Sequence, residues 1–99
     1  MSATLSSDEL RAGLEKLPGW TGDGTTIRRT LHAPDFPTAI ALVVAVGDAA
    51  EEMNHHPDMD IRWRDVHFAL STHSAGGVTA LDLELAGRID AAGAERGAN

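Results

Sequence analysis

The pattern of hydrophobic and polar positions predicts three helices. Either serine at positions 6–7 can cap the first, and Glu9 can complete a capping box with the earlier one. Asp35 can cap the second, which runs from Pro37 to about Asn54 through a stretch rich in Ala, Val, Leu and Ile. Thr79 can cap the third. The apolar stripes of the first and third helices are Leu10, Leu14 and Leu17, and Leu81, Leu85 and Ile89.

The segments between the helices predict two β-hairpins. Trp20-Thr21 and residues 25–31 flank a turn that contains two glycines, which supply positive φ at no steric cost. Residues 60–64 and 66–72 form the second hairpin, which we expect to turn near Arg64-Asp65. Hydrophobic residues alternate along the last strand, so one of its faces packs on a core. These alternating residues are Val66, Phe68 and Leu70.

The predicted order of elements is α-β-β-α-β-β-α. Two hairpins and three amphipathic helices indicate an α+β sandwich, with a four-stranded antiparallel sheet and the helices on one face. We expect a single domain over residues 1–99, with a core at about 5–90 and a frayed tail at 91–99. The apolar surface of the second helix is too wide for one core, which indicates contact with another subunit.

Composition narrows the range of partners. The formal charge is −7, and the eight Lys and Arg are scattered, which argues against direct nucleic-acid binding. The absence of cysteine excludes disulfides, thiolate metal sites and cysteine nucleophiles. We see no secretion signal and no apolar window long enough to span a membrane, so we expect a cytoplasmic protein.

Candidate chemistry gathers around three histidines. His55 and His56 follow a predicted helix, Glu51 lies one helical turn before His55, and His73 follows the second hairpin. Imidazole exchanges protons near neutral pH, and a neighbouring carboxylate orients it, so the cluster favours general acid–base catalysis. A plainer interpretation treats the pair as a helix C-terminal cap and Asp82 as part of a capping box that begins at Thr79.

A metal site would use the same side chains. Adjacent histidines on helical backbone point about 100° apart, and no recognised metal-binding spacing is present. We therefore predict no metal at His55, His56 and His73.

The spacing of these residues resembles a known signature. Glu51-x-x-x-His55-His56-Pro57, followed by Trp63, His73 and Asp82, is similar to the motif of the pterin-4a-carbinolamine dehydratases. Further segments resemble the family over about residues 5–90. They are Gly19-Trp20, Asp35-Phe36, Leu70-Ser71-Thr72-His73 and Gly76-Gly77-Val78-Thr79.

The resemblance implies an activity and a set of site residues. Family members dehydrate 4a-hydroxytetrahydropterin to quinonoid dihydropterin in pterin recycling, without a metal or an organic cofactor. By position, His55, His56 and His73 are the catalytic residues, with His55 and His73 as the acid–base pair and His56 positioning the pterin. Glu51 would orient His55 or bind the pterin ring, and Asp82 would support the site from behind. Further substrate contacts are expected from Asn54, Ser71, Thr72 and Ser74.

Other features follow from the same resemblance. Similar proteins associate through sheet edges and the second helix, so a homodimer or homotetramer is expected. Asn54 stands where many relatives carry Asp, which removes a negative charge beside the histidine pair. Relatives also act as partners of transcription factors, so a non-catalytic dimerisation or assembly role is the alternative, as is an enzyme acting on another pterin.

Overall fold

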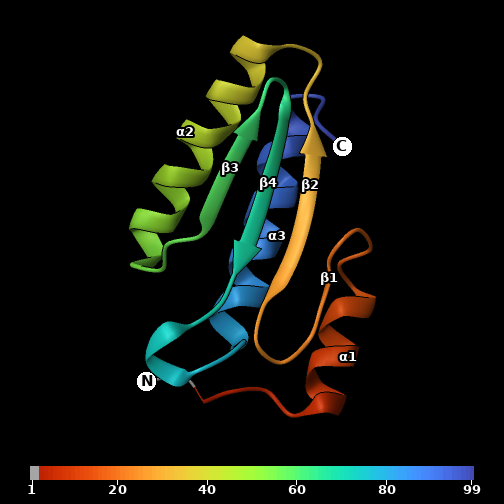
Figure 1. Cartoon of the computed structure of the whole chain (residues 1–99), viewed down its shortest axis with the longest axis vertical. Helices are drawn as coiled ribbons and strands as arrows, with labels where there is room; N and C mark the ends of the chain where they lie inside the picture. The colour runs from red at the N-terminus through yellow and green to blue at the C-terminus, as the bar shows by residue number, and fades with distance from the viewer. Residues whose placement is uncertain (1–2) are drawn as a thin grey trace.

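A computed structural model describes residues 3–99 and contains a single four-stranded sheet with helices packed against it (Figure 1). The sheet has the strand order β1-β2-β4-β3, and every neighbouring pair is antiparallel. The predicted α+β class and order of elements are confirmed. The elements are α1 (Ser7–Glu15), β1 (Thr21–Gly22), β2 (Ile27–His32), α2 (Phe36–Met53), β3 (Asp58–Arg62), β4 (Asp65–Leu70), the short 3-10 helix η1 (His73–Ala75) and α3 (Ala80–Glu95).

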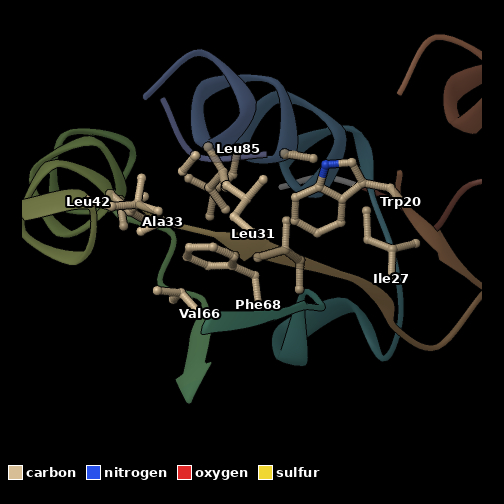
Figure 2. Packing of buried hydrophobic residues seen from close by; sticks show 14 of the residues in the cluster. Trp20, Ile27, Leu31, Ala33, Leu42, Val66, Phe68 and Leu85 are labelled. Atoms are coloured by element: carbon tan, nitrogen blue, oxygen red, sulfur yellow. The ribbon is translucent and has the colours of Figure 1, made fainter. Parts of the chain in front are cut away.

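The core lies between the helices and one face of the sheet. Along β4 buried residues alternate with half-buried ones, as expected for a strand with one face on a core. Figure 2 shows Leu31, Val66 and Phe68 of the sheet packed toward Leu42 of α2 and Leu85 of α3. The opposite face of the sheet carries no helix among the described residues.

Side-chain caps fix where the helices begin. Ser6 and Glu9 form the predicted capping box of α1, Asp35 accepts a hydrogen bond from the Thr38 backbone at 2.8 Å, and Thr79 forms a capping box with Asp82 at the start of α3. In the described part of the chain no helix is both long and apolar enough to cross a membrane.

Strand ends differ from the prediction by about two residues. β3 begins at Asp58 rather than at position 60, and β4 ends at Leu70 rather than at Thr72. The turn lies at Trp63-Arg64, because the loop is closed by the Arg62–Asp65 pair and Trp63 takes a positive φ of 57°. Sequence alone places aromatic residues inside strands, so a tryptophan in the turn was not expected.

The expectation of a frayed tail at 91–99 is wrong. Helix α3 continues to Glu95, and Asn99 exchanges two backbone hydrogen bonds with His32 on β2. A Cβ built on Gly93 would lie 2.8 Å from Leu31 Cδ1, so the missing side chain lets the helix approach the sheet closely. The Ala and Gly residues of 91–99 suggested a disordered tail, but a small residue such as Gly93 allows the tail to pack against the sheet.

Candidate active site

The C-terminus of α2 determines how the histidine pair is presented. Asn54 adopts a left-handed conformation, with φ 50°, and the His55 backbone N–H donates to the Ala50 carbonyl at 2.9 Å. This arrangement is a Schellman C-cap, in which asparagine substitutes for glycine. His55 and His56 therefore lie beyond the helix, not on it.

The predicted pairing of Glu51 with His55 is wrong for this reason. The turn at Asn54 directs His55 inward and leaves His56 outside, where its Nε2 lies 2.8 Å from Glu51 Oε1. Both side chains of this pair are mostly exposed, at 59% for His56 and 81% for Glu51.

His55 is instead held by Asp82. The His55 Nε2 lies 2.6 Å from Asp82 Oδ1, and the two side chains are only 9% and 0% exposed. The other carboxylate oxygen of Asp82 accepts hydrogen bonds from the Thr72 hydroxyl at 2.8 Å and from the Thr79 backbone N–H at 2.9 Å. Asp82 thus completes the capping box at the start of α3 and also fixes a histidine 27 positions away.

The contact with Asp82 allows a tautomer to be assigned to the His55 ring. An ionised carboxylate only accepts hydrogen bonds, so the hydrogen between His55 and Asp82 belongs to Nε2. The nitrogen that Asp82 leaves free, Nδ1, is then an acceptor in the neutral ring. Asp82 lies at the N-terminus of α3 and accepts hydrogen bonds from three donors, an arrangement that suits a carboxylate acceptor.

His73 lies next to a member of this network in the sequence. It begins η1 directly after Thr72, and its side chain is exposed. His73 and Ser71 line an open hollow of about 340 Å³ together with Asp58 and Gly76. A volume of this size is in the lower part of the range for small-molecule sites.

The remaining predicted site residues differ in how accessible they are. Asn54 and Ser74 are exposed and Ser71 is half-buried, so all three can reach a ligand. The Thr72 side chain is buried, and its hydroxyl donates to Asp82, so Thr72 can act on the site only through that carboxylate.

Sequence reasoning missed Asp58. This residue lines the hollow together with His73 and lies two positions after His56, whereas neither His55 nor His56 lines the hollow. Its place after the motif's proline was the available signal. Among residues 3–99 no group of three His, Asp or Glu side chains is arranged to hold a metal ion; the expectation that the protein uses no cofactor stays a prediction.

Known proteins resemble the chain over nearly its whole length. The family model described as "Pterin 4 alpha carbinolamine dehydratase" matches residues 3–92. A protein from Nocardia farcinica that carries the provisional name pterin-4-alpha-carbinolamine dehydratase is 56% identical over 86 residues, which are 87% of this chain and 90% of the relative. A protein of the same provisional name from Roseiflexus castenholzii is 52% identical over 90 residues, 91% of this chain and 97% of the relative.

A solved structure agrees with these sequence matches. The crystal structure of a transcriptional coactivator/pterin dehydratase from Brucella melitensis superimposes with a TM-score of 0.85 at 32% identity, covering 89% of this chain and 96% of its own. The fold, the motif and the sequence matches agree, and the chain belongs to the pterin-4a-carbinolamine dehydratase family.

Proposed function

We propose that the protein is a hydro-lyase that dehydrates 4a-hydroxytetrahydropterin to quinonoid dihydropterin. The observation that carries this proposal is the His55–Asp82 contact of 2.6 Å, which orients a catalytic imidazole beside the loop that presents His73. Membership of the dehydratase family supplies the substrate class.

The reaction is an elimination across C4a and N5 of the pterin. An acid protonates the 4a hydroxyl, the C4a–O bond breaks, and water leaves. A base removes the N5 proton, and its bonding electrons form the new C4a–N5 double bond. One proton is donated and one is accepted, so the total number of protons on the enzyme is unchanged; a proton transfer from the base to the acid through solvent restores the starting state, and no metal or organic cofactor is required.

The two buried contacts of Asp82 suggest how the roles divide. Asp82 holds His55 with the hydrogen on Nε2, so Nδ1 is the basic nitrogen that accepts the N5 proton. His73, exposed at the hollow, then donates to the departing hydroxyl. His56 and Glu51 form an exposed pair that positions the pterin, with Asn54, Ser71 and Ser74 as further polar contacts.

The test follows the absorbance of chemically generated 4a-hydroxytetrahydropterin with and without the purified protein. Spontaneous dehydration sets the baseline. We expect acceleration that is lost in His73→Ala and retained in His32→Ala, an exposed histidine that pairs with Asp65 on the β2–β4 ladder. Equal rates with and without folded wild-type protein would refute the proposal.

The alternative is a role as a binding partner. The Brucella protein is named as a transcriptional coactivator as well as a pterin dehydratase, and α2 here exposes apolar side chains at Phe36, Ile40 and Val44. We propose that this apolar surface joins copies of the chain into a homodimer or homotetramer. A cytoplasmic location stays an expectation from sequence.

A further inference from the structure

The hollow beside His73 opens on the face of the sheet that carries no helix among the described residues. Figure 1 shows α3 behind the sheet, so this open face is turned toward the viewer. Along β4 the buried Phe68 and Leu70 point to the core, so Ala69 between them points to the open face. Asp58 is the partner of Ala69 on β3, and residues paired across strands project from the same face. The Asp58 side chain is therefore placed on this face by strand pairing.

Segments from different parts of the chain enclose the hollow. Residues 69–71, at the end of β4, form its floor, because β4 lies between β2 and β3 in the sheet. Asp58 lines the hollow from the β3 side, and residues 25–26 line it from the β2 side. His73 lines it from η1. A flat molecule bound in the hollow therefore lies within reach of both a carboxylate and an imidazole.

The Asp58 carboxylate differs from the other carboxylates of the open face. Asp60 Oδ2 lies 3.2 Å from Arg62 Nε, and Asp65 Oδ1 lies 2.7 Å from His32 Nδ1. No ion pair joins Asp58 to another side chain within residues 3–99. Asp58 is also exposed, so its two oxygens can accept hydrogen bonds from a ligand. A carboxylate with both oxygens available suits two adjacent donors, which it binds in a bidentate manner.

Glu51, which the sequence suggested as a contact to the pterin ring, is less suited to hold two adjacent donors. Its Oε1 lies 2.8 Å from His56 Nε2, and its side chain is 81% exposed near the end of α2. It does not line the hollow that contains His73. Of these two carboxylates, Asp58 is therefore the one placed beside His73.

The ring of the proposed substrate carries a matching pair of donors. Its 2-amino group and its N3–H are adjacent, and C2 lies directly opposite C4a, the carbon that loses the hydroxyl, in the same six-membered ring. We propose that Asp58 accepts hydrogen bonds from the 2-amino group and N3–H together, which selects a 2-amino-4-oxo ring and directs C4a toward His73. The identity of the ring rests on the proposed function.

This role predicts discrimination against a 2-oxo ring. In 6-methyllumazine an oxygen replaces the 2-amino group of 6-methylpterin, so the same binding position turns a carbonyl oxygen toward the Asp58 carboxylate. One hydrogen bond is lost, and two acceptors then face each other. Isothermal titration calorimetry should show that the wild-type protein binds 6-methylpterin about 10- to 100-fold more tightly than 6-methyllumazine. Equal affinity for the two rings would contradict the proposal.

Asp58→Asn is the main test of the contact. The amide keeps the shape of the carboxylate but presents one acceptor and one donor, which match the N3–H and the 2-oxygen of the lumazine. The preference for 6-methylpterin should therefore fall by about tenfold or more. A smaller fall, in a variant with the circular dichroism spectrum of the wild type, would overturn the role of Asp58.

Two matched variants separate a contact with the ring from a general effect of charge. Asp60→Asn removes the same charge from the same strand and face, but from a carboxylate that faces Arg62. It should keep the wild-type preference, as should Glu51→Gln. A fall in Asp60→Asn equal to that in Asp58→Asn would show that charge alone sets the preference, and an equal fall in Glu51→Gln would assign the ring edge to the exposed pair. Either result contradicts the proposal.

A kinetic measurement distinguishes this role of Asp58 from the proposed function. In an active protein Asp58→Asn should raise KM for 4a-hydroxytetrahydropterin more than it lowers kcat, because the contact is made in the ground state as well as in the transition state. Accelerated dehydration together with an unchanged ring preference in Asp58→Asn would refute the role of Asp58 and leave the proposed function standing. If the folded wild-type protein neither binds 6-methylpterin nor accelerates dehydration, both are refuted.

Discussion

Two histidine–carboxylate pairs lie side by side at the end of α2, and they differ mainly in burial. His55–Asp82 and His56–Glu51 have similar separations, 2.6 and 2.8 Å. The first pair is nearly inaccessible and its carboxylate has further donors, whereas the second is largely in water. Similar geometry therefore has different consequences: removing one buried partner leaves uncompensated polar groups, while an exposed pair is weakened by solvent and salt.

The largest effect is expected from removing the buried carboxylate. Asp82→Ala leaves His55, Thr72 and Thr79 without their shared acceptor and should lower the free energy of unfolding by about 3–5 kcal/mol. Urea unfolding followed by circular dichroism measures this loss. Asp82→Asn keeps the shape but no longer fixes the His55 tautomer, so it should fold and lose on the order of 10²–10⁴-fold in dehydration rate. A folded Asp82→Asn variant with wild-type rate would contradict the role assigned to His55.

A smaller loss of stability is expected from changing Thr72, which acts on His55 only through Asp82. Thr72→Val replaces the hydroxyl that donates to Asp82 with a methyl group of similar size, and should cost about 1–3 kcal/mol of stability. The matched control is Thr30→Val, since the Thr30 hydroxyl contacts His67 at 2.6 Å on the open face of the sheet. Comparable losses of stability in both variants would show that the buried hydrogen bond to Asp82 contributes no more than the part-buried one to His67.

The exposed pair should contribute little to stability. Glu51→Gln should change the free energy of unfolding by less than about 1 kcal/mol, and this change should shrink further in 1 M salt. If His56 and Glu51 position the pterin, the variant raises KM more than it lowers kcat. A large fall in kcat at unchanged KM would instead assign the chemistry to the exposed pair.

The smallest effect concerns Asp23, a carboxylate whose pKa is lowered mainly by neutral hydrogen-bond donors. Hydrogen bonds from the Thr25 side chain, the Thr25 backbone and the Thr26 backbone hold the pKa of Asp23 below its ordinary value. Because this pKa is lowered in the folded state, the stabilisation is present above the unfolded-state pKa and is lost as the pH falls through the folded-state pKa. A carboxyl NMR titration should show the pKa of Asp23 rising in Thr25→Ala; no change would exclude Thr25 as the cause.

The sequence predicted the fold more fully than the site. Periodicity and caps depend on neighbouring residues, so the three helices, the two hairpins and the capping box at Thr79 could be inferred locally. The His55–Asp82 contact joins residues 27 positions apart, and no local pattern indicates it. Glu51 was assigned to the wrong histidine because helical spacing was extended past Asn54, where a left-handed residue ends the helix.

Asp82 both caps α3 and holds His55, and this limits which substitutions position 82 can accept. A capping box accepts glutamate readily at the third helical position, so a search for a more stable α3 would treat Asp82→Glu as harmless. One additional methylene would displace the carboxylate from both His55 and Thr72 at a position that is itself fully buried. At this position the start of a helix and the orientation of the His55 ring cannot be optimised separately, and under the proposed function variants selected for stability alone should lose activity here first.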